Sequence, residues 1–323
     1  MRVLRAGAAG FIGCHLAARY LRDGHEVVGV DNLCTGSREN VNWLASTPGF
    51  TFIEHDITQP LPFSGPLDLV CDLACPASPV DFGLLGLEIL DVCSRGVRNL
   101  LELAAAKEAV FLHTSTSEVY GDPDTHPQKE SYWGHVNPIG HRSVYDEGKR
   151  FAEAMIIAFH RRQTLPVRIA RIFNTYGPRM RPDDGRVVST FIIQALTGEN
   201  LTVQGDGTQT RSFCYIDDQV EALVRLARCS YHLPVNIGNP QEIPILQLAQ
   251  EVLALGESSS QIVFTPLPAD DPCRRRPDIA LARRILQWQP QVDRIVGLKA
   301  TYSYFRGVLS ESLSGSLASE GTP

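Results

Sequence analysis

The sequence predicts an α/β fold, in which a doubly wound parallel sheet is followed by a smaller C-terminal lobe. Two observations lead to this prediction. Over residues 1–175, short apolar runs typical of strands alternate with segments whose apolar residues recur at helical spacing, and beyond them Pro, Gly and Asp become frequent. Strands that alternate with helices favour right-handed crossovers and a parallel sheet. In such sheets, ligands bind at the carboxyl ends of the strands.

Local patterns predict the individual elements. The spacing of apolar residues, together with flanking Gly and Asp, separates strands from helices. The expected strands are 2–4, 26–31, 50–56, 67–74, 109–115 and 167–172. The expected helices are 11–22, 84–106 and about 143–163.

Composition and charge exclude several classes of protein. The 323 residues are 43% hydrophobic, which is enough for a sizeable core. The net charge of −6 implies no strongly basic face and argues against a nucleic acid partner. The absence of a long apolar run and of a secretory leader predicts no membrane partner and a cytoplasmic location. Eight cysteines without a C-x-x-C pair indicate reduced thiols and no metal site.

A dinucleotide site is indicated at the first turn from strand to helix. Gly7, Gly10 and Gly13 recur at intervals of three in this turn. Glycines permit the close approach of backbone to a pyrophosphate, which the amino end of the helix favours electrostatically. Asp31 ends the second strand, where a carboxylate can accept hydrogen bonds from ribose hydroxyls and repels a 2′-phosphate. The order of these parts predicts a Rossmann-type site for NAD rather than NADP.

Four polar residues form a candidate catalytic group. Tyr145 and Lys149 are four residues apart in a helical stretch, so both lie on one face. The ammonium, together with the positive nicotinamide ring of the cofactor, is expected to lower the pKa of the phenol toward the working range. Thr116 and Glu118 follow a buried strand, and alternation places them on one face if the strand continues that far. Thr116 is suited to bind a reacting hydroxyl, and Glu118 to act as acid or base or to position water.

These segments together resemble the extended short-chain dehydrogenase/reductases that act on nucleotide sugars, and within them the UDP-glucuronate decarboxylase group. The similarity covers about residues 1–305. It rests on GFIG (10–13), DNLCTG (31–36), PASP (76–79), TSEVYGDP (116–123), SYWGHVNPIG (131–140), YDEGKR (145–150), RIFNTYGPRMR (171–181), DGRVV (184–188), GDGTQTRSFCYIDD (205–218), NIGNP (236–240) and DDPCRRRPD (270–278). The resemblance implies NAD-dependent decarboxylation of UDP-glucuronate to UDP-xylose through a 4-keto intermediate, in a homodimer.

The resemblance also implies roles for individual residues and parts of the chain. The expected cofactor contacts are Gly7, Gly10, Phe11, Ile12, Gly13, Asp31, Asn32, Thr35, Gly36, Asp56, Ile57, Leu73, Tyr145 and Lys149. The expected substrate contacts are Pro76, Ser78, Asn99, Asn174, Arg186, Arg211, Tyr215 and Arg275. Residues 1–175 are expected to form the NAD-binding domain and 176–306 a partly interleaved UDP-sugar lobe. The Ser/Gly-rich tail, 307–323, is expected to be disordered.

Several residues depart from the family pattern. Arg5 occupies a position in a buried strand, and Ala8 replaces a glycine that is expected to need a positive φ. Asp72 stands where the family commonly has His, and Asp91 and Cys93 stand where it has Lys and Asn. Two alternatives therefore stay open. One is a related nucleotide-sugar 4-epimerase or 4,6-dehydratase, and the other is a catalytically impaired relative that acts as a binding partner.

Overall fold

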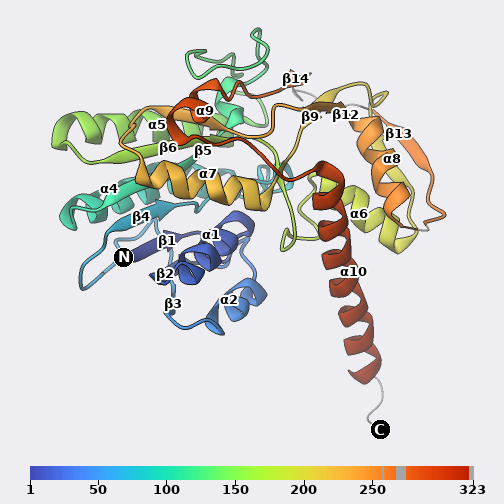
Figure 1. Cartoon of the computed structure of the whole chain (residues 1–323), viewed down its shortest axis with the longest axis horizontal. Helices are drawn as coiled ribbons and strands as arrows, with labels where there is room; N and C mark the ends of the chain where they lie inside the picture. Colours follow the sequence, from blue (N-terminus) through green and yellow to red (C-terminus); the bar gives the residue numbers. More distant parts are fainter. Residues whose placement is uncertain (257, 267–273, 320–323) are drawn as a thin grey trace.

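The computed structural model describes residues 1–256, 258–266 and 274–319 and confirms the α/β fold (Figure 1). Its central parallel sheet has seven strands in the order β11-β6-β5-β4-β1-β2-β3. The strands are β1 (Arg2–Ala6), β2 (Glu26–Asp31), β3 (Phe50–Glu54), β4 (Leu69–Asp72), β5 (Val110–Thr116), β6 (Val167–Ile172) and β11 (Pro234–Ile237). The strand order reverses between β1 and β4, so the carboxyl ends of these two strands frame the ligand-binding crevice of this topology.

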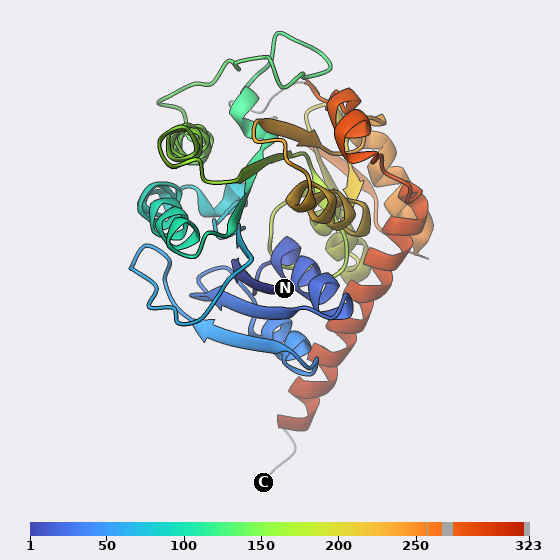
Figure 2. The same ribbon diagram turned by 60° about the vertical axis from the view of Figure 1, so that its left-hand side comes forward.

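Helices cover both faces of the sheet (Figure 2). One layer holds α1 (Phe11–Arg22), α2 (Arg38–Ala45) and α7 (Ile216–Arg228), and the other holds α3 (Gly86–Asp91), α4 (Val97–Ala106) and α5 (Ser143–Gln163). Apolar side chains fill the space between the sheet and each layer, among them Leu16 and Leu223 on one side and Leu100 and Ile156 on the other. The inner strands are accordingly apolar on both faces, as expected for a covered parallel sheet.

The helix predicted over 84–106 is interrupted. α3 ends at Asp91, a π-helical turn occupies Val92–Gly96, and α4 follows. A π-turn holds more residues per turn than an α-helix and so rotates the side chains that follow it. A Cβ on Gly96 would lie 2.8 Å from the Ile57 side chain, so the turn packs closely on the loop after β3. Apolar periodicity does not reveal such an interruption, because the buried face continues through it.

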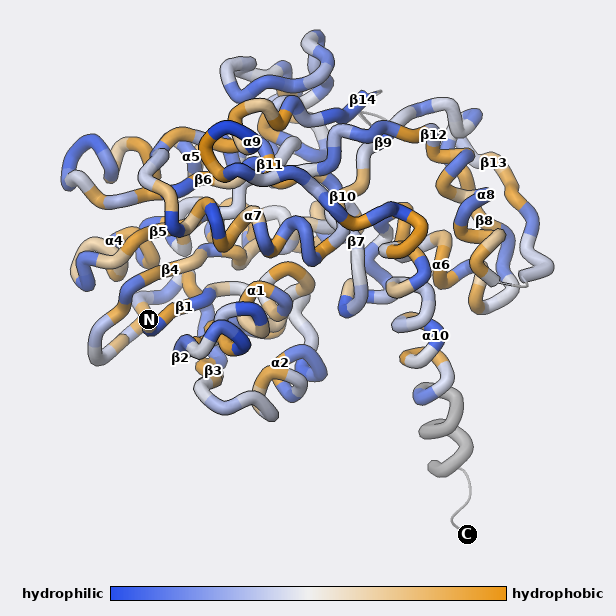
Figure 3. Tube along the Cα trace, viewed as in Figure 1, coloured by the Kyte–Doolittle hydropathy of each residue, from blue (hydrophilic) through white to orange (hydrophobic). Residues whose placement is uncertain are grey.

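The second lobe has its own small sheets and core. Its strands are β8 (Leu201–Gln204), β9 (Thr210–Ser212), β12 (Glu242–Pro244), β13 (Ile262–Thr265) and β14 (Arg274–Arg275), and β7 (Thr175–Tyr176) pairs with β10 (Cys214–Tyr215) below it. Its helices are α6 (Val187–Thr197) and α8 (Ile245–Leu255), which contribute residues to one buried hydrophobic cluster and are largely orange in the hydropathy colouring of Figure 3. α7, β11 and α9 (Ala280–Leu286) return to the central sheet, so the lobes interleave beyond residue 175.

The last helix extends into the tail. α10 (Arg294–Ser319) packs against the second lobe through Leu298, Tyr302 and Phe305. The sequence predicts disorder from residue 307, whereas the backbone stays helical through Ser319, and residues 320–323 lie outside the described part. A packed first segment explains the extension, because adding residues to an existing helix needs no new nucleation. Among the described helices, none is long and apolar enough to span a membrane.

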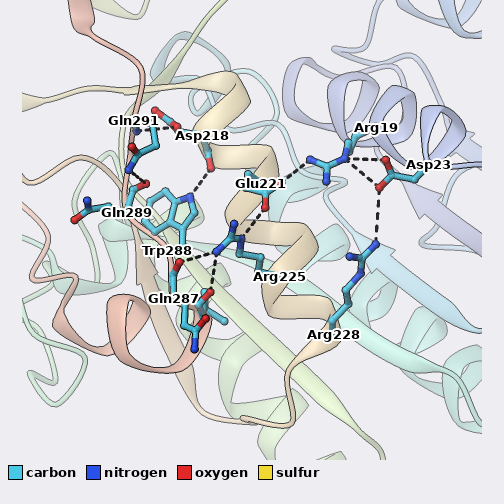
Figure 4. A network of polar contacts seen from close by, with 11 residues as sticks. Arg19, Asp23, Asp218, Glu221, Arg225, Arg228, Gln287, Trp288, Gln289 and Gln291 are labelled. Carbon is cyan, nitrogen blue, oxygen red and sulfur yellow. Dashed lines mark hydrogen bonds and ion pairs between the residues drawn. The ribbon is translucent and has the colours of Figure 1, made fainter.

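A polar network on the outer face of α7 joins it to α1 and to the C-terminal segment (Figure 4). The Glu221 carboxylate accepts hydrogen bonds from Arg19 and from Arg225, each at 2.6 Å. Arg225 also donates to the Gln287 carbonyl at 2.6 Å. One turn of α7 earlier, the Asp218 carboxylate accepts two backbone N–H groups of the segment that leads into α10. These contacts hold the C-terminal segment against the sheet layer.

Arg5 lies at the centre of the sheet with none of its surface exposed. It sits on β1 between Gly29 of β2 and Cys71 of β4. The guanidinium carbon is 5.1 Å from the centre of the Tyr20 ring, a cation–π arrangement. Within the described residues, the three guanidinium nitrogens have no hydrogen-bond partner. The charge therefore faces an aromatic ring in place of a carboxylate, which makes its burial costly.

We expect Arg5→Leu to raise the free energy of unfolding by about 1–3 kcal/mol, because it removes a buried charge and keeps an apolar side chain in the strand. Equilibrium unfolding in urea measures this change. Arg22→Leu removes an exposed charge at the end of α1 and is the control, with an expected change within about 0.5 kcal/mol. A less stable Arg5→Leu protein would contradict the prediction.

Candidate active site

A cavity of about 800 Å³ lies at the carboxyl edge of the sheet, between the sheet and the second lobe. Its volume falls in the upper range of small-molecule and cofactor sites. The predicted residues that line it are Gly7, Gly10, Phe11, Ile12, Gly13, Thr35, Gly36, Leu73, Ser78, Thr116, Glu118, Tyr145, Lys149, Asn174, Arg186, Arg211 and Arg275. The predicted residues outside its lining are Asp31, Asn32, Asp56, Ile57, Pro76, Asn99 and Tyr215.

The glycine turn between β1 and α1 forms one end of the cavity. Gly7 has φ of +77°, and a Cβ there would lie 2.6 Å from the Leu73 backbone. A Cβ on Gly13 would overlap the Gly7 carbonyl. Gly10 precedes α1 and has no side chain to cap it, so the amino end of the helix is presented through bare backbone. The turn therefore has space and polarity for a phosphate group.

Asp31 accepts hydrogen bonds from the backbone of this turn and of the loop after β2. Its Oδ2 accepts a hydrogen bond from the Ala9 N–H at 2.9 Å, and its Oδ1 accepts one from the Leu33 N–H at 2.8 Å. Burial raises the pKa of the carboxyl, and the two backbone donors act in the opposite direction. A Cβ on Gly36 would lie 2.9 Å from Asp31 Oδ1, so the glycine keeps the space beside that oxygen open.

Tyr145 and Lys149 meet at the middle of the cavity, on α5. The Tyr145 ring stacks on Phe82 with centroids 5.1 Å apart, and its hydroxyl pairs with Thr116. The Lys149 ammonium lies 5.9 Å from the centre of the Tyr145 ring and donates to the Thr114 carbonyl at 3.0 Å. The helix spacing predicted from the sequence thus brings these groups together with the end of β5.

The chain's own groups leave the pKa of Tyr145 above its ordinary value. Burial raises the pKa of Tyr145 to about 12, because it outweighs the opposing effects of Lys149 and the Thr116 hydrogen bond. The expected lowering toward the working range is therefore not achieved by the chain's own groups. Burial acts against the charged form of Lys149, but nearby Cys75, Cys93, Tyr145 and Asp72 raise its pKa. Lys149 is consequently an ammonium at neutral pH.

Glu118 is the centre of a buried ion cluster. Arg275 donates to both of its carboxylate oxygens, at 2.5 and 2.8 Å, and an Arg142 nitrogen lies 2.8 Å from Oε2. Burial opposes the charge, yet Arg275 and Arg142 lower the pKa of Glu118, which is therefore ionised. The strand ends at Thr116 and a 3₁₀ turn covers Ser117–Tyr120, so strand alternation does not explain how Glu118 reaches the cavity.

The second lobe brings polar side chains to the opposite wall. Arg186 donates to the Ala77 carbonyl at 2.8 Å and to Asp184 at 3.1 Å. The Ser78 hydroxyl donates to the Asp184 carbonyl, which ties the PASP loop to the start of α6. Arg211 on β9 is buried and donates to the Thr210 carbonyl at 2.8 Å. Guanidinium groups here are suited to phosphate or carboxylate.

Two predicted substrate contacts have partners elsewhere in the fold. The Asn99 amide donates to the Ile57 carbonyl at 2.8 Å and so holds the loop after β3. The Tyr215 ring lies 5.6 Å from the Tyr176 ring, and a Cβ on Gly297 would come within 2.7 Å of it. Asn99 thus supports a loop, and Tyr215 packs toward α10.

Several lining residues were not predicted from the sequence. Arg142 is three residues before Tyr145, and helical spacing from the Tyr-x-x-x-Lys pair could have indicated it. Arg181 is paired with Asp81 at 3.0 Å. Arg179 stacks on Trp43, with the guanidinium carbon 3.9 Å from the ring centre. These last contacts join loops far apart in the sequence, which no local pattern signals.

The structure also shows where the departures from the family pattern lie. Ala8 is buried but has no positive φ, so the expected backbone conflict is absent at this position. Asp91 lies outside the cavity lining, with its carboxylate 3.6 Å from Arg95 at the surface. Asp72 is fully buried and its Oδ2 lies 2.7 Å from His113 Nδ1. Asp72 is thus partnered by a neighbouring strand rather than exposed to a ligand.

The chain belongs to the NAD dependent epimerase/dehydratase family, whose model matches residues 3–238. UDP-glucuronic acid decarboxylase 3 of Arabidopsis thaliana is 50% identical over 307 residues, which cover 95% of this chain and 89% of that protein. UDP-glucuronic acid decarboxylase 1 of Danio rerio is 49% identical over 304 residues, or 94% of this chain and 72% of that protein. A crystal structure of UDP-glucuronic acid 4-epimerase from Bacillus cereus, in complex with UDP-glucuronic acid and NAD, has a TM-score of 0.85 and 29% identity, and covers 95% of this chain and 100% of that chain.

The glycine turn fits the cofactor of this family, which is NAD. The positions of Gly7 and Gly13 leave no space for a Cβ, so bare backbone faces the place of a pyrophosphate. The Asp31 carboxylate beside Gly36 has lone pairs left for ribose hydroxyls after its two backbone bonds. The same charge repels a 2′-phosphate, in agreement with a preference for NAD over NADP.

Asp146 adds a titratable group behind the ion cluster. It lies on α5 next to Tyr145, is 5% exposed, and its Oδ1 has no hydrogen-bond partner among the described residues. Burial and the nearby Glu118 charge raise its pKa from 3.8 to about 7. The folded chain therefore holds this proton over a pH range in which the unfolded chain releases it.

Raising the pH from about 5 to about 7 should thus destabilise the folded state through Asp146, because the unfolded state binds fewer protons over this range. Asp146→Asn lacks this titration, so its free energy of unfolding should fall less over the same range than that of the unaltered chain. Urea unfolding at both pH values measures the difference. Asp206→Asn, which removes a carboxylate whose pKa is lowered by hydrogen bonds to Thr208, should leave the pH dependence unchanged. Equal pH dependence with and without Asp146 would contradict the assignment.

Proposed function

We propose that this chain is a UDP-glucuronate decarboxylase that converts UDP-glucuronate to UDP-xylose and carbon dioxide through a 4-keto sugar. The observation that carries the proposal is that Tyr145, Thr116 and Arg275 line one cavity. Tyr145 is suited to take the proton of a sugar hydroxyl, and Arg275 is a cation near which an acidic sugar can bind. Proteins named UDP-glucuronic acid decarboxylase that match 95% of the chain at 50% identity support the same activity.

The first stage is oxidation at C4 of the sugar. NAD, held at the glycine turn of Gly7, Gly10 and Gly13 with Asp31 beside it, would supply the reversible hydride chemistry that this stage needs. Tyr145 takes the C4 hydroxyl proton as its phenolate, the form that Lys149 and the Thr116 hydrogen bond favour against burial, and Thr116 binds the C4 oxygen. The Lys149 ammonium lowers the cost of the phenolate beside it. The product is a ketone at C4, which is β to the carboxylate on C5.

The second stage is loss of carbon dioxide. The electron pair of the broken C–C bond is delocalised onto the C4 ketone oxygen, so an enolate forms. Tyr145, now protonated, and Thr116 donate hydrogen bonds to that oxygen and stabilise its charge. Reprotonation at C5 and reduction at C4 complete UDP-xylose, and Tyr145 gives up no net proton over the cycle.

Glu118 acts in this scheme as an ionised positioning group. Two guanidinium groups face its one carboxylate, so the cluster keeps a net positive charge toward the cavity. That charge suits the substrate carboxylate, and Glu118 fixes where Arg142 and Arg275 stand. The lowered pKa of Glu118 disfavours a role as direct proton donor, so a water that it orients is the candidate donor at C5.

The substrate diphosphate is assigned to the second lobe. Arg186 and Arg211 line the same cavity as Tyr145 and Lys149. Arg186 stands at the start of α6, between the PASP loop and the lobe, where it can follow movement of either. Asn174 on the loop after β6 provides a further polar contact. Cationic groups spaced along the wall match a ligand that is negative at its diphosphate and at its carboxylate.

The proposed assembly is a homodimer joined through α3, α4 and α5. Leu84 and Leu87 are 83% and 78% exposed, and Leu90 and Phe151 are also exposed, so apolar residues gather on this helical layer. Exposed apolar clusters of this kind mark interaction surfaces. The proposed location is the cytoplasm, and the free thiols of the described cysteines suit a reducing compartment.

The activity is tested by incubating the protein with UDP-glucuronate and NAD and separating the products by mass. The expected product is UDP-xylose, which has lost the mass of carbon dioxide. A product of unchanged mass would indicate a 4-epimerase and contradict the proposal. Absence of any product, with retained binding of UDP, would indicate an impaired relative.

Tyr145→Phe should lower turnover about a hundredfold or more, because it removes the oxygen that accepts the C4 proton. Release of carbon dioxide under saturating UDP-glucuronate measures the effect. Binding of UDP and the unfolding transition should change little. Tyr231→Phe makes the same chemical change outside the cavity lining and should keep full turnover. Near-normal release by Tyr145→Phe would overturn the assigned role.

Glu118→Gln should lower turnover more than tenfold, because it keeps the shape of the side chain but withdraws the charge that holds two buried guanidinium groups. Turnover is measured at saturating UDP-glucuronate, alongside UDP affinity. Glu54→Gln removes the acidic partner of an exposed ion pair with Arg38 and is the matched control. Unchanged turnover would reject the positioning role. A loss of UDP affinity equal to the loss of rate would make Glu118 a binding residue.

A further inference from the structure

Two cysteine thiols meet at the floor of the cavity. Cys75 lies in the loop after β4, and Cys93 lies in the π-helical turn between α3 and α4. Their sulfur atoms are 3.8 Å apart, within hydrogen-bond range for sulfur. Cys75 lines the cavity, whereas Cys93 is 1% exposed. The pair therefore joins a reagent-accessible sulfur to a buried one.

The pair is packed against the catalytic helix. A Cβ on Gly148 would lie 3.2 Å from both Cβ and Sγ of Cys93, so α5 approaches this cysteine where it has no side chain of its own. Gly148 directly precedes Lys149. Cys93 also shares a buried cluster with Tyr145 and Phe82. A change at the thiol pair is thus transmitted to the residues that carry the proposed acid–base chemistry.

The electrostatic setting favours one thiolate in the pair. The hydrogen bond from Cys75 is the main cause of a lowered pKa at Cys93, with burial acting against it and the Lys149 ammonium adding to it. The same hydrogen bond raises the pKa of Cys75, and burial raises it further. A thiolate that accepts a hydrogen bond beside an ammonium is the reactive form of cysteine.

We propose that Cys75 and Cys93 form a reversible disulfide on exposure to a peroxide and that this bond shuts off turnover. In the first step the proton of Cys75 passes to the Cys93 thiolate, the resulting Cys75 thiolate attacks one peroxide oxygen from the cavity, the O–O bond breaks, and a sulfenic acid and hydroxide form. In the second step the other thiol attacks the sulfenic sulfur, an S–S bond forms, and water leaves. The two cysteines lose two electrons and two protons, and one hydrogen peroxide becomes two water molecules.

The disulfide would bring the Cys75 loop and the π-turn, both beside the active site, closer together. A disulfide requires the sulfurs to approach from 3.8 Å to about 2.05 Å. This approach draws the loop that holds Leu73 and Pro76 toward the π-turn and moves Cys93 relative to Gly148. Tyr145 and Lys149 are set by the same helix, and misplacement by about 1 Å is enough to lower turnover strongly.

The experiment treats the reduced purified protein with hydrogen peroxide, blocks the remaining thiols with N-ethylmaleimide and maps the cysteine peptides by mass spectrometry. The expected result is a Cys75–Cys93 cross-link that grows as turnover falls at least tenfold, with both reversed by dithiothreitol. Peptide mapping uses no nucleotide sugar, so it detects the cross-link even if the proposed substrate is wrong. A sulfinic acid on Cys75 without a cross-link would overturn the proposal.

Two variants separate the pair from other thiols. Cys93→Ser, compared with its own untreated rate, should keep its turnover under peroxide and show no cross-link at Cys75. Cys229→Ser removes a half-buried cysteine at the end of α7 and should respond as the unaltered protein does. Equal loss of turnover in Cys93→Ser and the unaltered protein would reject the disulfide as the cause.

A reagent that needs no oxidation tests whether the sulfurs of Cys75 and Cys93 lie close together. Phenylarsine oxide bridges two thiols that lie close together, so it should bind the reduced protein in a form that dithiothreitol reverses and a monothiol does not. Cys93→Ser should lose this binding. Failure of the reagent to protect both Cys75 and Cys93 from N-ethylmaleimide would show that the two sulfurs do not act as a pair and would overturn the proposal.

Discussion

The ion cluster of Glu118 with Arg142 and Arg275 is the interaction on which the cavity depends. Glu118 belongs to the turn after β5, Arg142 leads into α5, and Arg275 comes from β14 of the second lobe. One buried carboxylate therefore joins the sheet, the catalytic helix and the lobe that covers them. Because the charges are withdrawn from water, each is stable only while its partners stay in place. The cluster thus sets the distance between the two walls of the site.

The cavity also shows how local charge differs from overall charge. The chain carries a net charge of −6, yet Lys149, Arg186, Arg211 and the two arginines of the cluster line this one cavity. Cations gathered in a cleft with low-dielectric walls attract an anionic ligand far more strongly than their number suggests. Some acidic residues, such as Asp81 and Asp184, also line the cavity, and the rest lie elsewhere and keep the overall balance negative. An acidic protein can therefore hold a strongly anionic nucleotide sugar.

The sequence predicted well what depends on local period and spacing. The glycine turn, the end of β2 at Asp31, and the pair Tyr145 and Lys149 each follow from the geometry of one strand or helix. Contacts between distant segments were less predictable. The contact of Arg142 with the Glu118 carboxylate is an example, because no motif joins these two residues.

Errors arose where packing overrides local pattern. The π-turn at Val92–Gly96 packs closely on the loop after β3, and α10 continues to Ser319 beyond its packed first segment. Neither the π-turn nor the longer α10 changes the spacing of apolar residues enough to be predicted from the sequence. The burial that raises the pKa of Tyr145 also depends on distant segments, because Phe82 stacks on its ring. Spacing alone predicts which side chains lie close together but not how deeply they are buried away from water.

The interleaving of the two lobes has a consequence for how the chain is made. β6 ends at Ile172, but its outer partner β11 begins only at Pro234, so about sixty residues must leave the ribosome before that edge is paired. Until then, an apolar parallel strand presents open backbone groups and is exposed to pairing with another chain. The high sequence separation of this contact also slows folding. During synthesis the chain therefore passes through a stage in which β6 has no outer partner, and a fragment that stops at residue 175 keeps that open edge permanently.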